Sequence, residues 1–197
     1  MWDERYNASD YAYGKNPNNF LQQHAGRLSK GKVLCLADGE GRNGVFLAQQ
    51  GFSVTSVDAS AVGLAKAARL AQEKGVTIEC IHADLNDFAP GEAQWDSIVS
   101  IFCHLPPPLR TRVHQRVVRA LKPGGTFLLE AYTPAQLEFG TGGPSVAEMM
   151  MTAQQLREEL AGLTFELLQE TEREVIEGLY HTGRASVVQL LGKKARD

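Results

Sequence analysis

The sequence predicts a doubly wound, Rossmann-like α/β fold on a seven-stranded sheet that is mostly parallel, with an antiparallel last strand. Five short apolar or β-branched runs alternate with helix-like stretches, which is the pattern of successive strand–helix–strand units. The last two runs are separated by polar residues 170–184, which include Gly178 and Gly183 and favour an antiparallel hairpin at the sheet edge. A chain of 197 residues with 43% hydrophobic residues can bury one core, so we expect a single domain over residues 1–197.

The predicted strands are the apolar runs at residues 32–36, 53–57, 76–81, 97–102, 126–130, 165–169 and 186–191. The periodicity between them predicts helices over residues 43–50, 60–74 and 110–121. Ser60 is a typical N-cap for the second helix, and Gly75 ends it. The Pro-Gly-Gly run at residues 123–125 predicts a sharp break before the fifth strand.

Two segments lie outside this alternation. Residues 1–30 carry three tyrosines and an amphipathic stretch around residues 20–28, and residues 133–150 carry a cluster of glycines. We expect the first to form an N-terminal cap and the second a lid over the carboxyl ends of the strands. The alternative for both is an ordinary terminal helix or loop.

The composition argues against several classes of protein. A formal net charge of −3 gives no electrostatic case for binding nucleic acid or an anionic membrane. No apolar run approaches the roughly 20 residues that a membrane helix needs, and the first residues show no apolar signal segment. Cys35, Cys80 and Cys103 are odd in number and set in apolar runs, which predicts buried thiols rather than disulfides or a zinc site. We therefore expect a cytoplasmic protein without a metal site.

The most informative segment, residues 33–44, is an apolar strand followed by a glycine-rich turn and a helix start. Gly39, Gly41 and Gly44 would let a ligand approach the backbone closely. Asp58 ends the second predicted strand, 19 residues after Gly39, near the roughly 20-residue spacing typical of a ribose-binding carboxylate. A carboxylate there can accept hydrogen bonds from both ribose hydroxyls.

The turn also carries two acidic residues, Asp38 and Glu40. Carboxylates beside the glycines repel a pyrophosphate but suit a cationic or zwitterionic ligand. S-adenosylmethionine carries an ammonium and a sulfonium group, so it suits this turn better than a dinucleotide does. Asp84 ends the third predicted strand, where it could hold the adenine amino group while Leu85 packs near the ring. The alternative is that Asp84 caps the segment that follows it.

Together these motifs resemble those of class I S-adenosylmethionine-dependent methyltransferases, in particular the TehB-like (tellurite-resistance) and thiopurine-methyltransferase-like group. The resemblance runs through the segments at residues 2–6, 13–18, 39–43, 57–58, 84–86, 121–125 and 177–181. It implies S-adenosyl-L-methionine as cofactor and S-adenosyl-L-homocysteine as product. The residues expected to bind the cofactor are Tyr13, Asp38, Gly39, Glu40, Gly41, Asn43, Asp58, Asp84, Leu85 and Phe102.

The chain departs from the common pattern of this class at several positions. Cys35 stands where an acidic residue is common, and Ala37 stands where glycine is common. Either Asp38 or Glu40 would then contact the cofactor amine, and the sequence does not decide between them. Residues 102–107 differ from the Asn/Asp-Pro-Pro-Tyr motif of enzymes that methylate amino groups of nucleic-acid bases and some protein amides. With the negative net charge, this difference argues against nucleic-acid substrates.

Three residues are predicted to serve the methyl acceptor. His104 follows the fourth predicted strand, at the edge where α/β sheets bind ligands. His181 precedes the last strand, where tellurite-type members place a functional histidine, and either histidine could act as a base or, when protonated, hold an anion. Arg184 could pair with an anionic acceptor near His181. Soft nucleophiles such as thiolates, selenite or tellurite need little help from a base, so we expect a small-molecule acceptor of this kind.

Two other functions stay open at this level. A non-catalytic protein that senses or stores S-adenosylmethionine would share every cofactor motif. A nicotinamide-dependent oxidoreductase shares the strand, the glycine turn and the ribose carboxylate. The acidic turn and the hairpin end disfavour the oxidoreductase.

Overall fold

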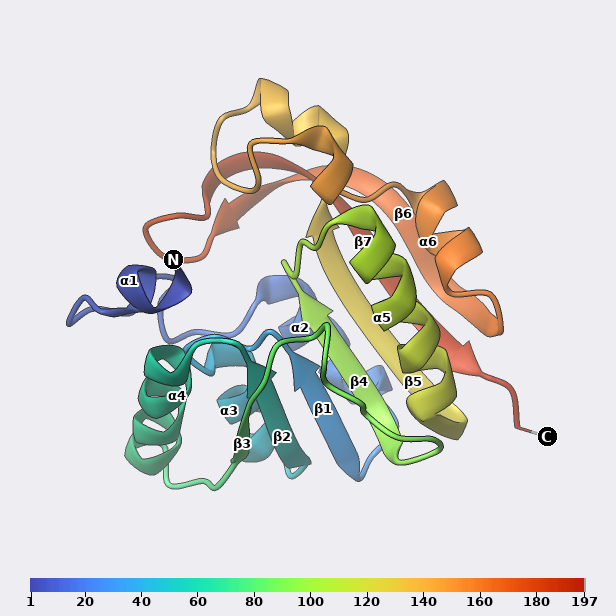
Figure 1. Cartoon of the computed structure of the whole chain (residues 1–197), viewed down its shortest axis with the longest axis horizontal. Coiled ribbons are helices and arrows are strands. Elements are labelled where there is room, and N and C mark those ends of the chain that lie inside the picture. Colours follow the sequence, from blue (N-terminus) through green and yellow to red (C-terminus); the bar gives the residue numbers. More distant parts are fainter. Residues whose placement is uncertain (197) are drawn as a thin grey trace.

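The computed structural model describes residues 1–196 and has the predicted architecture (Figure 1). Its seven-stranded sheet has the order β3-β2-β1-β4-β5-β7-β6. The strands are β1 (Lys32–Leu36), β2 (Ser53–Asp58), β3 (Glu79–His82), β4 (Trp95–Ile101), β5 (Leu121–Tyr132), β6 (Leu163–Ile176) and β7 (Thr182–Lys194). Strands β1 to β5 pair in parallel, whereas β7 is antiparallel to both β5 and β6. The predicted mostly parallel sheet with an antiparallel end is confirmed.

Helices cover both faces of this sheet. They are α1 (Trp2–Tyr6), α2 (Asn19–His24), α3 (Arg42–Gln49), α4 (Ala61–Glu73), α5 (Pro107–Ala120) and α6 (Ala153–Glu159), with short 3₁₀ turns at Ala25–Arg27, Pro134–Glu138 and Ala147–Met149. Helices α5 and α6 pack on one face, and α2 and α3 pack on the other. Side chains of β1 alternate between the two cores, with Leu34 on the α5 side and Cys35 on the α3 side.

Helix α4 begins where the sequence predicts. The Ser60 hydroxyl accepts a hydrogen bond from the backbone N–H of Gly63 at 3.0 Å, which caps the helix. Gly75 follows the helix in a left-handed conformation with φ of +70°. Among residues 1–196, no helix is long and apolar enough to cross a membrane.

The start of β5 differs from the prediction. Leu121 already pairs with Trp95, so the strand begins before the Pro-Gly-Gly run rather than after it. The register between β4 and β5 shifts between Trp95 and Ser97, and this irregularity accommodates Gly124, which has φ of +77°. Glycine and proline therefore mark a bulge in the strand here, not a break before it.

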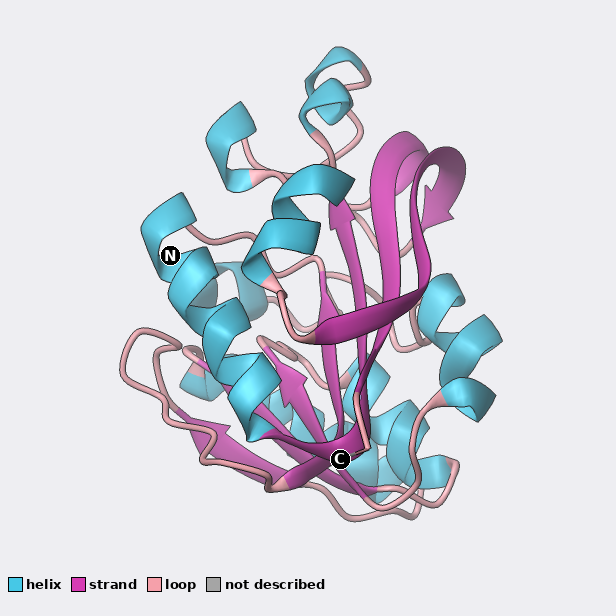
Figure 2. Ribbon diagram, turned by 90° about the vertical axis from the view of Figure 1, so that its right-hand side faces the viewer, coloured by secondary structure: helices cyan, strands magenta, loops and turns pink. Residues whose placement is uncertain are grey.

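The largest difference lies in the hairpin. The sequence predicts a polar connection over residues 170–184, but β6 continues to Ile176 and β7 begins at Thr182. Glu170, Glu172 and Glu174 are exposed and alternate with more buried residues. This alternation has the two-residue period of a β-strand, although the segment is rich in charged residues. Figure 2 shows the long β6–β7 ribbon rising past the other strands and curling over. Its turn, residues 177–181, reaches the N-terminal segment, where the N–H of Leu179 donates to the carbonyl of Ala12 at 3.0 Å.

Helix α6 was not predicted, although a local signal marks it. Thr152 accepts a hydrogen bond from the backbone N–H of Gln155, whose side chain accepts one from the backbone N–H of Thr152. This reciprocal arrangement is the capping box, and its Thr-x-x-Gln pattern is readable in the sequence.

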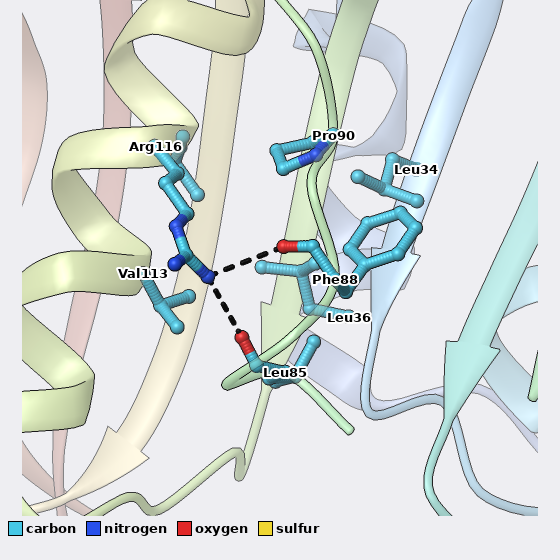
Figure 3. A pocket seen from close by; sticks show the side chains of 8 residues that line it. Leu34, Leu36, Leu85, Phe88, Pro90, Val113 and Arg116 are labelled. Carbon is cyan, nitrogen blue, oxygen red and sulfur yellow. Dashed lines mark hydrogen bonds between the residues drawn. The ribbon is translucent and has the colours of Figure 1, made fainter. Parts of the chain in front are cut away.

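The segment that follows β3 is held against α5. Arg116 Nη1 donates to the carbonyl oxygens of Leu85 and Phe88, at 3.1 and 3.2 Å (Figure 3). The apolar cavity beneath these contacts has a volume of only about 10 Å³. It is a packing gap, and the hydrogen bonds of Arg116 anchor the segment that follows Asp84.

Candidate active site

A cavity of about 900 Å³ opens at the carboxyl ends of the parallel strands. Its walls come from the N-terminal segment, the glycine turn after β1, the ends of β2 and β4, the segment after β3, the loop at residues 142–149, and the β6–β7 turn. Strands β1 and β4 are neighbours in the sheet, and the chain runs outward in opposite directions from them. Such a switch point is where open α/β sheets bind ligands.

The structure brings most of the predicted site residues to this cavity. Those lining it are Tyr13, Asp38, Gly39, Glu40, Asn43, Asp58, Asp84, Leu85, Phe102, His104 and His181. Gly41 and Arg184 do not line it. A Cβ on Gly41 would lie 2.5 Å from the Cβ of Ala67, so this glycine lets α4 pack closely rather than letting a ligand approach. Arg184 is exposed on β7, where its Nε donates to Glu172 at 2.8 Å.

Two strained residues shape the strand ends at the switch point. Ala37, directly after β1, has φ of +49°, and Phe102, directly after β4, has φ of +50°. Left-handed backbone is uncommon for residues with a Cβ and gathers at functional sites. Ala37 occupies the position where the related class commonly has glycine, and the positive φ explains that preference.

Asp58 is fixed by the turn that it faces. One carboxylate oxygen accepts from the N–H of Gly39 and the other from the N–H of Ser60, both at 2.8 Å. Burial raises the pKa of Asp58, while these two backbone donors favour the carboxylate form. Each oxygen has a further lone pair, so Asp58 can still accept hydrogen bonds from a ligand diol.

The two acidic residues of the turn have different partners. Glu40 forms a buried ion pair with Lys66 of α4 and accepts from the N–H of Ala12 at 2.8 Å. Asp38 accepts from the Ser56 hydroxyl at 2.6 Å, and no cationic side chain among residues 1–196 pairs with it. Burial raises the pKa of Asp38 to about 7. Of the two carboxylates, Asp38 is therefore the one that lacks a counter-charge.

Lys66 also holds the N-terminal segment over the site. Its Nζ donates to the carbonyl oxygens of Tyr6, Ala8 and Asp10, at 3.2, 2.9 and 2.7 Å. A buried ammonium with this many partners is fully satisfied. The N-terminal cap is thus built onto the glycine turn and α4.

An aromatic cluster forms the wall beside the β6–β7 turn. The ring of His181 lies 4.6 Å from that of Tyr13, 4.7 Å from that of Phe102 and 5.3 Å from that of Tyr132. The ring of His104 stacks on Tyr132 at 5.6 Å, and its Nε2 accepts from the backbone N–H of Tyr132 at 3.0 Å. This bond places the proton of a neutral His104 on Nδ1.

Both histidines are neutral at neutral pH. Burial lowers the pKa of His104 to about 4, and burial together with the nearby Arg42 lowers that of His181 to about 3. Neither side chain therefore holds an anion as an imidazolium at that pH. Burial also raises the pKa of Cys103 to about 12, so this cavity residue is a thiol and not a thiolate.

Apart from Glu40 Oε2, which lies in the ion pair with Lys66, three buried polar atoms of this region have no hydrogen-bond partner among residues 1–196. They are Arg42 Nη1, Tyr132 Oη and His181 Nδ1. An unpaired buried polar atom costs about 1–3 kcal/mol, so each one points to a partner such as a water, an ion or a ligand. Arg42 and His181 both line the cavity, which indicates a wall completed by a bound molecule.

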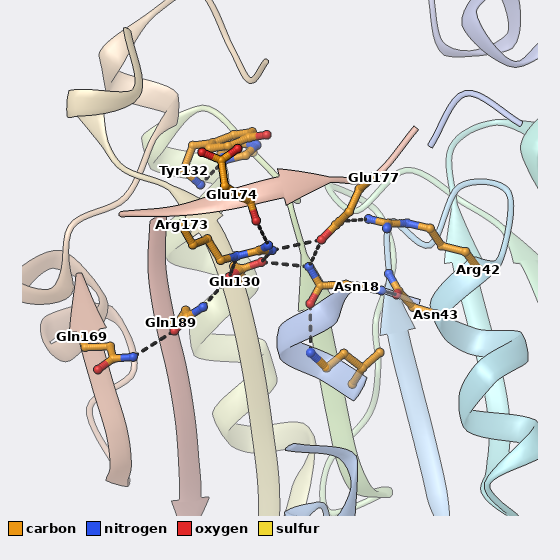
Figure 4. Close-up of polar contacts among 12 residues, drawn as sticks. Asn18, Arg42, Asn43, Glu130, Tyr132, Gln169, Arg173, Glu174, Glu177 and Gln189 are labelled. Carbon is orange, nitrogen blue, oxygen red and sulfur yellow. Dashed lines mark hydrogen bonds and ion pairs between the residues drawn. The ribbon is translucent and has the colours of Figure 1, made fainter. Parts of the chain in front are cut away.

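A buried charge network joins the turn of the ribbon to the glycine turn (Figure 4). Glu177 pairs with Arg42 at 2.6 Å and with Arg173 at 3.0 Å, and Arg173 also pairs with Glu130 of β5. The amide of Asn18 donates to Glu130 at 2.8 Å and to Glu177 at 2.9 Å. The sequence-based prediction did not connect these residues, because no local spacing relates them.

Arg5 is a second cation of the cavity wall. Its Nη1 donates to the Tyr13 hydroxyl at 3.0 Å, and its guanidinium lies over the rings of Tyr180 and Trp2, at 4.8 and 5.2 Å. No carboxylate among residues 1–196 lies within ion-pair distance of it. Arg42, by contrast, is neutralised by Glu177.

Comparison with known proteins agrees with this geometry. A model of the methyltransferase domain family matches residues 33–125, which hold the glycine turn, Asp58, Asp84 and the Pro-Gly-Gly run. A 2-heptyl-1-hydroxyquinolin-4(1H)-one methyltransferase of Mycobacteroides abscessus is 27% identical over 117 residues. That match covers 58% of this chain and 52% of the relative, so the chain spans about half of that protein's length.

Solved structures share the fold at low sequence identity. A protein from echinomycin biosynthesis, where a disulfide bond is converted into a thioacetal group, superposes with a TM-score of 0.79 and 18% identity, over 99% of this chain and 88% of that one. TehB from Haemophilus influenzae has a TM-score of 0.73 and 20% identity, over 98% and 65%. A SAM-dependent methyltransferase from Methanosarcina mazei has a TM-score of 0.67 and 20% identity, over 86% and 94%.

The fold and the site therefore define the class I methyltransferase architecture, and the predicted resemblance to that class, TehB included, is confirmed. Residues 33–125 are similar to the methyltransferase domain family. S-adenosylmethionine is the cofactor that this domain implies. The residues present fit it, because a buried carboxylate faces the turn at Asp58, Asp38 lacks a counter-charge, and aromatic rings line the same cavity.

Proposed function

We propose that the chain is an S-adenosylmethionine-dependent methyltransferase that acts on a small-molecule acceptor. The observation that supports this most directly is the cavity of about 900 Å³, which joins carboxylates at the strand ends to an aromatic wall from the N-terminal segment and the β6–β7 turn. The methyltransferase domain over residues 33–125 supports the same conclusion. A cytoplasmic location belongs to this proposal, on the strength of three free cysteines.

In this proposal each cofactor group meets a residue of matching chemistry. When bound, S-adenosylmethionine supplies an electrophilic methyl group on a positively charged sulfur. Asp58 accepts hydrogen bonds from the ribose, and Asp84 and Leu85 hold the adenine. Asp38 takes the amine, because Glu40 is already paired with Lys66. Arg42 Nη1, buried without a partner, is the donor available for the cofactor carboxylate.

The rest of the cavity would position the acceptor and exclude water. Tyr13, Phe102 and His181 form an aromatic wall that suits a sulfonium and a flat acceptor. Because His104 and His181 are neutral and weakly basic, a soft or already ionised nucleophile such as a thiolate, selenite or tellurite suits the site best. Arg184 lies outside the cavity, so we do not assign it to the acceptor.

The test combines binding and transfer. Calorimetry with S-adenosylhomocysteine measures cofactor binding, and methyl-labelled S-adenosylmethionine in sealed vials measures transfer to tellurite, selenite, iodide and thiols. Binding together with labelled product above a boiled control supports the proposal. Binding without transfer to any of these acceptors would overturn the soft-nucleophile acceptor and favour a non-catalytic cofactor-binding protein. Binding of NADH in preference to S-adenosylhomocysteine would overturn the cofactor assignment.

A further inference from the structure

The exposed apolar side chains of the molecule gather at the mouth of the cavity. Seven large apolar residues are exposed in the described structure, and four of them, Met1, Trp2, Val146 and Tyr180, line the cavity. Two more, Ile176 and Leu179, lie at the turn end of the β6–β7 ribbon. A soluble domain exposes such a patch where an apolar ligand or partner binds.

The same mouth holds an uncompensated positive charge. Arg5 is one of two cationic side chains that line the cavity, and it is the one without a carboxylate partner among residues 1–196. It is held in place by the Tyr13 hydroxyl and by the rings of Tyr180 and Trp2. A guanidinium positioned on aromatic faces can bind an anionic group and stack on a planar one.

The cavity offers the acceptor little that can remove a proton, because Asp38, whose pKa burial raises to about 7, is the carboxylate proposed to hold the cofactor amine. The lone pair on Nε2 of His104 is already used by the N–H of Tyr132, and Asp58 is held by two backbone donors. Burial lowers the pKa of His181 to about 3, so it is a weak base. An acceptor must therefore arrive with its nucleophile ionised, and Arg5 is the group that favours this form.

We propose that the methyl acceptor is a small amphiphilic molecule with a planar apolar body, which packs on Trp2, Val146 and Tyr180, and an acidic thiol or hydroxyl group that is ionised in solution and attracted by Arg5. This inference rests on the proposed methyltransferase function and narrows its substrate class. The acceptor anion supplies the electron pair of the new bond to the methyl carbon. The carbon–sulfur bond of the cofactor breaks, its electron pair stays on sulfur, and no proton has to move.

Four probes separate the two features, apolarity and charge. 4-Nitrothiophenol is apolar and ionised at neutral pH, and benzyl mercaptan is apolar but protonated. Selenite is ionic and hydrated, and 2-mercaptoethanol is neither apolar nor ionised. Calorimetric binding of each probe to the protein saturated with S-adenosylhomocysteine gives a readout independent of turnover, and labelled methyl transfer gives the second. We expect 4-nitrothiophenol to bind at least about tenfold more tightly than the other three and to be methylated fastest.

Substitutions of Arg5 and Tyr180 test which residue recognises the charge of the acceptor and which recognises its apolar body. Arg5→Gln should weaken binding of 4-nitrothiophenol about tenfold and change that of benzyl mercaptan less than about twofold, whereas Arg5→Lys should retain part of the affinity. Arg69→Gln, an exposed arginine away from the cavity, is the matched control. Tyr180→Ser should weaken binding of both aromatic thiols. Its control is Leu137→Ser, because both residues are 47% exposed but only Tyr180 lines the cavity.

The outcomes distinguish this inference from the proposed function. If S-adenosylhomocysteine binds and selenite or 2-mercaptoethanol is methylated as well as 4-nitrothiophenol, the amphiphilic acceptor is wrong and the methyltransferase stands. Unchanged binding of 4-nitrothiophenol by Arg5→Gln would overturn the role of Arg5. If S-adenosylhomocysteine does not bind to the folded protein, the proposed function itself fails.

Discussion

Arg42 and Glu177 form a buried ion pair at 2.6 Å although 135 residues separate them in the chain. Arg42 begins α3 directly after the glycine turn, and Glu177 begins the turn of the β6–β7 ribbon. This contact therefore connects the proposed cofactor end of the cavity to the segment that carries Tyr180 and His181. Asn18 and Arg173 contact the same carboxylate, so the N-terminal cap shares the connection.

Glu177→Gln should strongly destabilise the protein. Removing this charge leaves Arg42 and Arg173 buried with less compensation, and breaking a buried pair costs about 3–5 kcal/mol. Glu172→Gln, on the adjoining strand β6, is a matched control, because its partner Arg184 is exposed, and exposed pairs contribute about 0–1 kcal/mol. Urea unfolding of both variants measures the difference. Equal losses in the two variants would contradict the structural role given to the Arg42–Glu177 pair.

Asp58→Asn should weaken binding of S-adenosylhomocysteine by about 10- to 100-fold, since a hydrogen bond to a charged group contributes about 1.5–3 kcal/mol. The amide can no longer accept from Gly39 and Ser60 with both of its polar atoms. Calorimetry gives the affinity, and circular dichroism checks that the fold is kept. Asp87→Asn, an exposed residue outside the cavity, should bind as the wild type does. Wild-type affinity in Asp58→Asn would remove Asp58 from the cofactor site.

Gly41→Ala should cost more stability than Gly51→Ala. Both glycines have positive φ, at +85° and +90°, so both substitutions carry the strain of a left-handed backbone, about 1–2 kcal/mol. Only at Gly41 would the new Cβ meet a neighbour, Ala67 of α4, whereas nothing lies within 4 Å at Gly51. Overpacking adds about 1–3 kcal/mol. Thermal or urea unfolding compares the stabilities of the two variants. An equal loss of stability would show that α4 can move away from the new methyl group at little cost.

The contribution of His181 to the free energy of unfolding should fall as the pH is lowered from 6.5 to 5. In this range an unfolded histidine binds a proton, whereas the native His181, with a pKa lowered by burial to about 3, does not. Protonation therefore favours the unfolded chain, at up to about 1.4 kcal/mol per pH unit for each such group. His181→Gln should lose about 1.5 kcal/mol less than the wild type over this interval. Urea titrations at the two pH values measure the slopes, and parallel slopes would contradict the neutral buried imidazole.

Much of the fold follows from local patterns. The parallel strands alternate with periodic helices, and the glycine turn, the Ser60 cap and the position of Asp58 are each readable within about 20 residues. Helix α6 was readable as well, from the capping box at Thr152 and Gln155. The β6–β7 ribbon was harder to predict from the sequence, because the charged residues of β6 lower its strand propensity. Its extended conformation is stabilised by the pairing of β6 with β7, which in turn pairs with β5.

The candidate active site was likewise only partly predictable from local sequence. Residue types and spacing were enough to place carboxylates, glycines and two histidines at the carboxyl edge of a sheet, because short segments set strand ends and turns. The spacing did not show that Glu40 is neutralised by Lys66, that Gly41 serves helix packing, or that Arg184 points away from the cavity. Nor did it indicate that Arg5 lies on Tyr180, or that Arg42 pairs with Glu177. Those partners are distant in the chain, so only tertiary folding decides which charges are buried together and which remain available to a ligand.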